Sequence, residues 1–142
     1  MIQTGKGEKR RSIQRQLHMD SFNKGQDYSR SDIHAQVGGS IQSYLPDVNG
    51  KIVAGCFRLD TNPDAPKVIL PGNGPQIKRV AKLLASGKYA IPVFIKQAVN
   101  QWRFVGNFRV NRICDDPVEI RKQSQKSGRS DISGILYLSE VV

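Results

Sequence analysis

The chain has 142 residues, 38% of them hydrophobic, which is enough to bury one core, so we expect a single folded domain. Its 22 Lys and Arg against 12 Asp and Glu give a formal net charge of +10, as in proteins that bind nucleic acid or another polyanion. Two cysteines and two histidines are too few for a typical zinc site, and no apolar run could span a membrane. We therefore expect a soluble, cytoplasmic protein without metal or cofactor.

Residues 1–27 are rich in Gln, Lys, Arg and Gly, and their hydrophobic residues are too sparse to build a core. We interpret them as a flexible basic arm ahead of a folded domain of residues 28–142. The basic run of residues 9–11 would suit a phosphate backbone, or it is a solvated leader.

The folded part is expected to begin with a two-turn helix within residues 28–39. Ser29 or Ser31 can accept hydrogen bonds from its first free N–H groups, and Gly38 suits its end. Further along, Asn49-Gly50 indicates a tight turn. The turn leads into residues 52–59, an apolar and β-branched run typical of a buried strand.

Residues 60–66 contain two X-Pro pairs and are expected to form a rigid loop before a short strand at residues 67–70. A helix is predicted to follow, with Asn73 as its cap and Pro75 in its first turn. Its apolar residues share one face and its cations the other. The apolar face comprises Ile77, Val80, Ala81, Leu83 and Leu84, and the basic face comprises Lys78, Arg79 and Lys82.

Two further strands are expected, at residues 90–96 and 101–110. In the second, strict alternation would place Trp102, Phe104 and Phe108 on one face, and Arg103 and Arg109 together on the other. Residues 115–130 are polar and are interpreted as a loop with at most one helical turn, before a last strand within residues 132–141. This order predicts an α+β fold: a small curved mixed sheet or partly open β-barrel with one or two packed helices.

Residues 65–114 contain nine basic residues and no Asp or Glu, so the best-patterned part of the chain should carry a positive face. Ribosomal, chromatin and lipid-binding proteins share such a charge. The glycines at 38 and 39 would let the backbone approach a phosphate beside Ser40, although a plain helix-ending turn explains them as well. The expected phosphate contacts are Arg30, Ser40, Lys78, Arg79, Lys82, Arg103 and Arg109.

Residues 102–110 (WRFVGNFRV) resemble the aromatic-x-Gly-x-aromatic-x-Val strand of SRA domains, also called YDG domains, of the PUA-like superfamily. Residues 91–96 fit the preceding strand, and residues 28–34 are similar to the opening of SRA-like segments attached to bacterial HNH restriction endonucleases. The resemblance covers about residues 28–110. It implies a β-barrel that recognises modified cytosine in DNA, often by base flipping. This chain has Phe-Val-Gly at residues 104–106 where the family has Tyr-Asp-Gly, so the acidic position is replaced.

A flipped base needs an aromatic surface to stack on and polar groups at its edge, because unstacking it costs a few kcal/mol. Tyr44 and Asp47 are the best candidate pair for such a pocket. The aromatic candidates otherwise belong to the core, and the polar ones otherwise form turns. The full set of base-pocket candidates is Tyr44, Asp47, Phe57, Asp60, Asn62 and Trp102.

These observations favour a non-catalytic reader of 5-substituted cytosine in double-stranded DNA, serving a restriction or defence system with a nuclease on another chain. One alternative is a PUA-like RNA-binding protein. A second is a small magnesium-dependent nuclease using Pro46-Asp47, with Asp115, Asp116 and Glu119 as possible ligands of a divalent ion. A third is a protein-interaction module whose basic residues serve solubility. The sequence contains no convincing catalytic motif.

Overall fold

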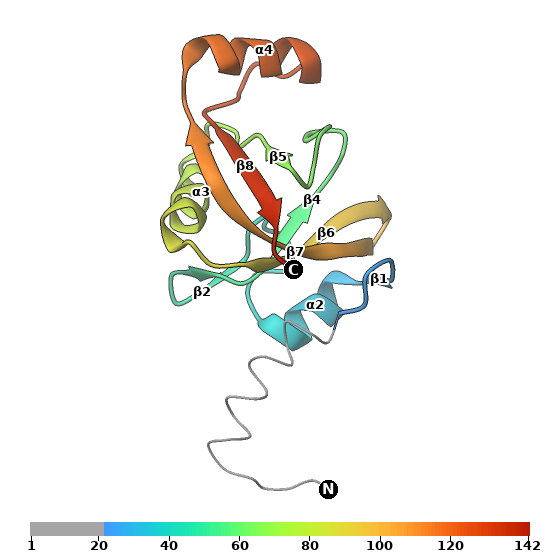
Figure 1. Ribbon diagram of the computed structural model, residues 1–142. Coiled ribbons are helices and arrows are strands. Elements are labelled where there is room, and N and C mark those ends of the chain that lie inside the picture. Colours follow the sequence, from blue (N-terminus) through green and yellow to red (C-terminus); the bar gives the residue numbers. More distant parts are fainter. Residues whose placement is uncertain (1–21) are drawn as a thin grey trace, which may run out of the picture.

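The structure is a computed structural model that describes residues 22–142, so most of the expected basic arm, residues 1–21, lies outside the described residues. The described part is α+β, as predicted (Figure 1). It contains three helices and a mixed six-stranded sheet that does not close into a barrel. The helices are α2 (Arg30–Val37), α3 (Pro75–Gly87) and α4 (Pro117–Ser127).

The sheet runs in the order β4-β6-β7-β8-β5, and β1 pairs separately with β7. Only the β4–β6 pairing within this sheet is parallel. A small antiparallel ribbon, β2–β3, stands apart from it. The strands are β1 (Asp27–Tyr28), β2 (Asp47–Val48), β3 (Lys51–Ile52), β4 (Gly55–Phe57), β5 (Val68–Ile69), β6 (Ile91–Ala98), β7 (Gln101–Cys114) and β8 (Ile135–Glu140).

The predicted ends of the first helix and the predicted tight turn at Asn49-Gly50 are confirmed. Ser29 caps α2 through a capping box with Asp32, and Gly38 ends the helix at φ 84°. Asn49 and Gly50, both at positive φ, form the two-residue turn between β2 and β3. The long buried strand expected at residues 52–59 is divided instead into β3 and β4, because residues 53 and 54 leave the ladder between them.

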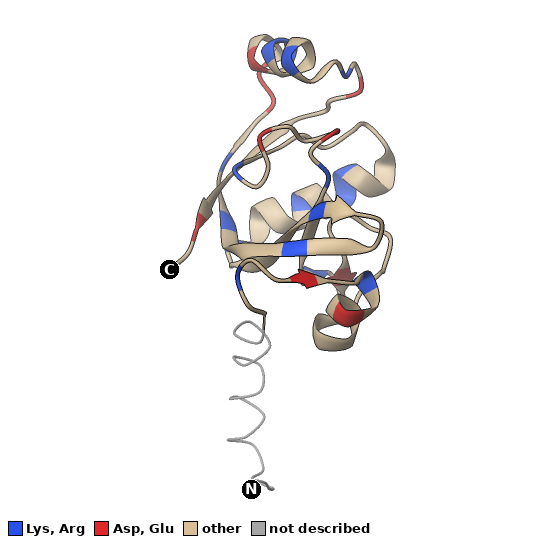
Figure 2. Cartoon of the chain, turned by 90° about the vertical axis from the view of Figure 1, so that its right-hand side faces the viewer, with Lys and Arg blue, Asp and Glu red and all other residues tan. Residues whose placement is uncertain are grey.

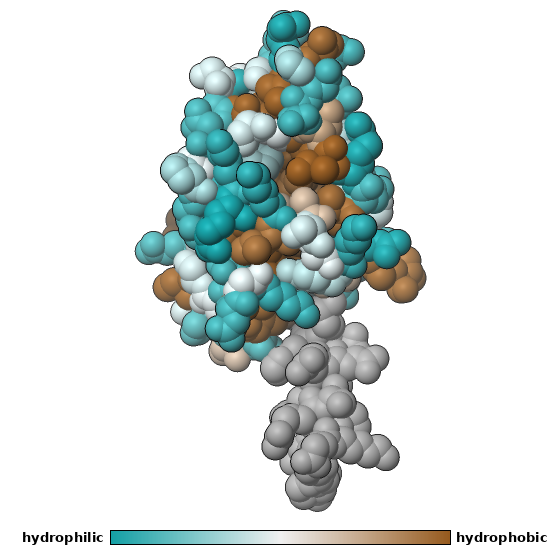
Figure 3. Space-filling view, turned by 90° about the vertical axis from the view of Figure 1, so that its left-hand side faces the viewer, coloured by the Kyte–Doolittle hydropathy of each residue, from teal (hydrophilic) through white to brown (hydrophobic). Residues whose placement is uncertain are grey.

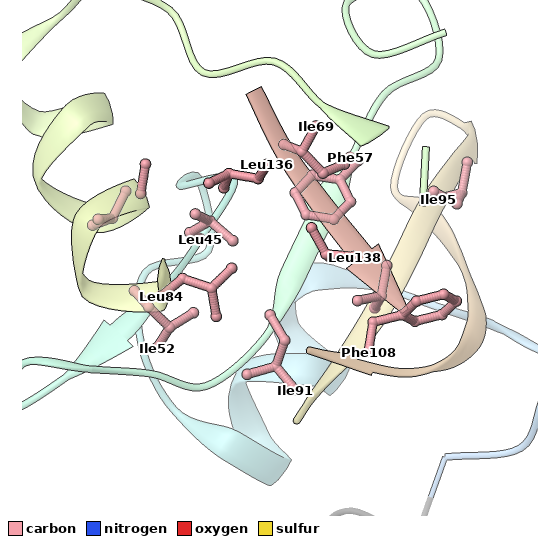
Figure 4. Close-up of a cluster of buried hydrophobic side chains, with 13 residues drawn as sticks. Leu45, Ile52, Phe57, Ile69, Leu84, Ile91, Ile95, Phe108, Leu136 and Leu138 are labelled. Carbon is pink, nitrogen blue, oxygen red and sulfur yellow. The ribbon is translucent and has the colours of Figure 1, made fainter. Parts of the chain in front are cut away.

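Helix α3 covers one face of the sheet and closes the main core. Val80, Ala81 and Leu84 are its buried residues, as the predicted apolar face requires, whereas Ile77 is 38% exposed. They pack with side chains from β3 to β8 and the loop before β2 (Figure 4). The labelled members are Leu45, Ile52, Phe57, Ile69, Leu84, Ile91, Ile95, Phe108, Leu136 and Leu138.

A second core lies on the other side of the sheet, against α2. It contains Phe22, Ile33, Phe94 and Trp102, with the Phe22 ring edge-on to Phe94 at 4.9 Å between centroids. Phe22 is only 4% exposed, although the sequence pattern placed it in the arm. The folded domain therefore already includes residues 22–27, because β1 and this aromatic cluster anchor them.

A bulge in β7 contradicts the expected alternation along this strand. Val93 pairs with Gly106 but Phe94 pairs with Phe104, so β7 contains one extra residue between these pairs. Side chains beyond this bulge therefore point to the opposite faces from those that strict alternation predicts. Phe104 consequently belongs to the second core and Phe108 to the main core. The prediction that the arginines at 103 and 109 project from the same side is therefore wrong.

Within residues 115–130, which were expected to form a loop with at most one helical turn, residues 117–127 form a helix of 11 residues. Asp116 caps α4 by accepting a hydrogen bond from the Glu119 backbone N–H at 3.1 Å, Pro117 occupies its first turn, and Gly128 ends it in the left-handed region. None of its 11 residues is buried. The helix lies at one end of the domain, beyond β7 and β8 (Figure 1).

Candidate nucleic-acid interface

An open cavity of about 610 Å³ lies beside the N-terminal half of α3. Its walls come from the loop before β2, the segments before and after β5, α3, and the segment that follows α4. Three of the six predicted base-pocket residues line it: Tyr44, Asp47 and Asn62. The other lining residues are Ser40, Gln42, Ser43, Thr61, Leu70, Pro71, Gly72, Gln76, Ile77, Val80, Arg129 and Asp131.

Tyr44 presents an aromatic surface to this cavity. Its hydroxyl donates a hydrogen bond to the carbonyl of Ile77 at 2.7 Å, and its ring packs on Phe57 with centroids 6.4 Å apart. Burial raises the pKa of the Tyr44 hydroxyl, and the positive charge of Arg129 opposes this shift in part. Because the hydroxyl proton is already donated to Ile77, Tyr44 can offer a ligand its ring and the acceptor capacity of its oxygen.

Asp47 supplies a carboxylate to the same cavity. It lies at the start of β2, and its side chain is 22% exposed. Arg79 of α3 donates to its Oδ1 at 3.3 Å and is itself positioned by a hydrogen bond to Gln76. The ion pair therefore orients the carboxylate and connects the β2–β3 ribbon to α3.

Asn62 and Arg129 hold in place the segments before and after β5, which form part of the cavity wall. The Asn62 side-chain oxygen accepts the backbone N–H of Leu70 at 2.7 Å. Arg129 donates to the carbonyls of Thr61 and Leu70 at 2.9 and 2.8 Å, and forms a two-point ion pair with Asp131. The hydrogen bond from Arg129 lowers the pKa of Asp131. Neither Arg129 nor Asp131 was predicted as a site residue; Arg129 lies within residues 115–130, whose polar pattern indicated a loop.

The other three base-pocket candidates lie elsewhere. Phe57 is 1% exposed in the main core, behind Tyr44, and Trp102 is 7% exposed in the second core. The exposed Asp60 is held by Arg58, whose hydrogen bond lowers the pKa of Asp60. These residues do not line the cavity, because the two aromatics were needed for core packing and the acid faces solvent.

The cations of α3 border a second, smaller hollow of about 280 Å³. Lys78 and Lys82 line it together with Ala81, Ile113 and Asp115. Figure 3 shows the side of the molecule that carries α3, where hydrophobic surface is visible between hydrophilic side chains. Helix α3 thus separates this hollow from the larger cavity, with two exposed lysines on one side and the Arg79 ion pair on the other.

Three other expected phosphate contacts, Arg30, Ser40 and Arg103, already form hydrogen bonds or ion pairs within the domain. Arg30 is 8% exposed, donates to the carbonyls of Ser40 and Ser43, and stacks on Trp102. It therefore fixes a loop and has little surface to offer a phosphate. The Ser40 hydroxyl accepts backbone N–H groups of its own turn, and Arg103 pairs with Asp27.

The basic segment does not produce one uniform positive face. Arg79, Arg103 and Arg112 form ion pairs with Asp47, Asp27 and Glu119, which all lie outside residues 65–114. Arg109 is exposed on the opposite side of β7 from Arg103. Figure 2 shows Lys and Arg positions spread along the domain, including several on α4.

Side chains that could hold a metal ion do not gather in the described part of the chain. No three His, Cys, Asp or Glu side chains of residues 22–142 are close enough to hold a metal ion. Cys56 and Cys114 are both free and buried, in different cores, and burial raises the pKa of Cys56 to about 12. None of the three described helices is long and apolar enough to cross a membrane.

Comparisons with known proteins give a similarity in fold. No protein-family model matches the chain, and no curated protein does either. Among solved structures, the chain is similar to part of the Type IV phosphorothioation-dependent restriction endonuclease ScoMcrA. The TM-score is 0.51 and the identity 15%, over 84% of this chain but only 28% of the endonuclease chain. At this identity the similarity shows a shared fold, and the fold found here is one that occurs within a restriction endonuclease.

Proposed function

We propose that this chain is a non-catalytic DNA-binding domain that reads 5-substituted cytosine by taking the base out of the duplex into the cavity beside Tyr44 and Asp47. The double-stranded DNA would be recognised for a restriction or defence system, with a nuclease on another chain doing the cutting. The observation that carries the proposal is the cavity itself. Its volume of about 610 Å³ falls in the range of small-ligand sites.

The chemistry of the cavity walls suits a modified cytosine. The ring of Tyr44 offers a stacking surface, and the Asp47 carboxylate can accept a hydrogen bond from the exocyclic amino group of the base, as acidic side chains do for cytosine. Leu70, Ile77 and Val80 add apolar surface that would favour a methyl-sized substituent. These contacts would offset the cost of unstacking the base.

Two further observations support the proposal, one for the restriction context and one for contact with DNA phosphates. The fold resembles part of ScoMcrA, a phosphorothioation-dependent restriction endonuclease. The exposed Lys78 and Lys82 lie on the helix that forms one wall of the cavity, where they would contact the phosphates flanking a flipped nucleotide.

The test is a binding panel of otherwise identical duplexes that carry 5-methylcytosine, 5-hydroxymethylcytosine, a phosphorothioate linkage or no modification, together with a structured RNA. We expect a 5-substituted cytosine to be preferred over the plain duplex by more than about tenfold, or about 1.4 kcal/mol. Equal affinity for all duplexes would contradict the proposal. Preference for RNA would favour the RNA-binding alternative, and preference for the phosphorothioate would contradict base reading.

A matched pair of variants locates the recognition. Asp47→Asn should reduce the preference roughly tenfold, because a well-placed contact to a base edge is worth about 1–3 kcal/mol of discrimination. Asp60→Asn is the control, since it also breaks an arginine ion pair but lies outside the cavity. Equal effects of the two substitutions would place recognition elsewhere.

The non-catalytic assignment has its own test. We expect no cutting of modified or plain DNA on incubation with Mg²⁺. Metal-dependent cleavage that is abolished by Asp47→Ala would show that the domain is a nuclease.

A further inference from the structure

Helix α4 separates its charges between two faces. Its half-buried positions include Glu119, Ile120 and Gln123, whereas Arg121 and Lys122 are exposed on the opposite side. The acidic residue of the helix therefore points toward the domain and the basic pair points away. Only one hydrophobic residue of α4, the half-buried Ile120, packs against a core cluster, and no residue of the helix is fully buried.

Polar contacts hold the inner face in place. The Glu119 carboxylate accepts a hydrogen bond from Tyr137 at 2.7 Å and pairs with Arg112 at 3.3 Å, and these two contacts lower the pKa of Glu119. Near the other end of the helix, Lys126 pairs with Asp64. The helix is thus anchored at both ends, and its single carboxylate is used in the anchoring.

The outer face is left with uncompensated positive charge. Within residues 22–142, no carboxylate forms an ion pair with Arg121 or Lys122. Val118 and Gln125 are exposed beside them. Such a face is complementary to a polyanion and offers little to a hydrophobic partner.

Both ends of α4 lead to the hollows beside α3. Asp115, which precedes the helix cap, lines the smaller hollow with Lys78 and Lys82. Arg129 and Asp131, which follow the helix, line the larger cavity. A duplex with one base in that cavity would therefore continue past α4.

We propose that α4 is a second DNA-backbone contact, in which Arg121 and Lys122 bind phosphates of the same duplex whose base enters the cavity. The inference rests on the proposed function for the identity of the polyanion. An 11-residue helix is roughly 16 Å long, which allows contact with several successive phosphates at 3.4 Å of axial spacing per strand.

The test is the salt dependence of binding to the plain duplex. The double variant Arg121→Gln/Lys122→Gln should reduce the slope of log affinity against log salt by about 1.8, since each phosphate contact contributes about 0.9. The control is Lys51→Gln/Lys88→Gln, which removes the same charge near the β2–β3 ribbon, at the opposite end of the domain from α4 (Figure 1). We expect the control to keep the wild-type slope, and circular dichroism should show both variants folded.

The modified-to-plain affinity ratio separates this inference from the proposed function. The α4 variant should weaken binding to both duplexes equally and leave the ratio unchanged, because phosphate contacts carry no base information. An unchanged slope in a protein that still discriminates would overturn the role of α4 and leave base reading intact. A lowered slope in a protein that never discriminates would support the role of α4 and contradict base reading.

Discussion

The Tyr44 hydroxyl donates to the Ile77 carbonyl, so a base in the cavity would meet the tyrosine ring. This arrangement separates two functions within one residue. The hydroxyl joins the loop before β2 to α3, and in the proposed function the ring would supply the stacking surface for the base. This hydrogen bond holds the Tyr44 ring in position before a ligand binds, so less conformational entropy is lost on binding.

Tyr44→Phe should lower the free energy of unfolding by about 1 kcal/mol at neutral pH, because the Ile77 carbonyl loses its donor while the ring is kept. The pKa of Tyr44 is raised in the folded state, so its stabilising effect is complete below the ordinary value of 10.0 and is lost as the pH rises through the folded-state pKa. Urea denaturation at neutral pH and above pH 10 measures both effects. A difference between wild type and variant that stays constant above pH 10 would contradict this account.

Arg129→Met should destabilise the domain by about 1.5–3 kcal/mol, because it leaves the carbonyls of Thr61 and Leu70 without their charged donor. Asp131→Asn is the comparison, since it weakens the ion pair but leaves both carbonyl contacts in place. Urea denaturation of the two variants measures the difference. If both substitutions cost the same, the carbonyl contacts are not what holds the cavity wall.

The sequence identified part of the cavity for a physical reason. Tyr44 and Asp47 belong to a polar loop that ends in a tight turn, and there the Tyr44 ring is only partly buried against the main core, so one part of it stays accessible. Phe57 and Trp102 occupy apolar and alternating strands, and there burial decided their position. Arg129 acts on carbonyls 59 and 68 residues earlier in the chain, and no local pattern encodes such a contact.

At the level of elements, the bulge in β7 decides which side chains share a face. Residues that alternate perfectly in the sequence are divided between two cores, and Arg103 and Arg109 lie on opposite sides. A single inserted residue reverses every later side chain. Hydrophobic alternation predicted the strand correctly but carries no information about this reversal.

Gly106→Ala should destabilise the domain by about 1–3 kcal/mol, because this residue has φ 130°, a region that other residues rarely adopt. A Cβ atom at this position would also lie 2.6 Å from Oε2 of Glu140. Gly74→Ala is the control, since Gly74 has φ −67° and a Cβ there would meet only Ile77 at ordinary contact distance. Thermal or urea unfolding compares the two, and a loss of equal size in both would contradict the proposed strain at the bulge.

Helix α4 shows that caps can carry more information than hydrophobic periodicity. Its residues lack an apolar stripe, so the segment looked like a solvated loop. Asp116, Pro117 and Gly128 nevertheless stand at the positions where helices begin and end. Giving more weight to these three residues would have predicted the helix, although not the ionic contacts that dock it.

At the scale of the whole molecule, residues 65–114 contain no Asp or Glu, but acidic side chains from other segments lie beside them on the surface. Folding brings Asp27, Asp47 and Glu119 from other segments against its arginines. The cations without such partners in the described structure include Lys78 and Lys82 on α3, near the hollows that α4 also borders. The electrostatic case for DNA binding therefore depends on this end of the domain rather than on the net charge.

The proposed function requires that one modified cytosine leaves the duplex and enters the cavity. The imino proton of the guanine opposite that cytosine reports pairing directly in an NMR spectrum of the saturated complex. We predict that this resonance disappears while those of the neighbouring pairs persist, since a flipped base leaves its partner unpaired. Retention of the resonance in the fully bound complex would contradict the account.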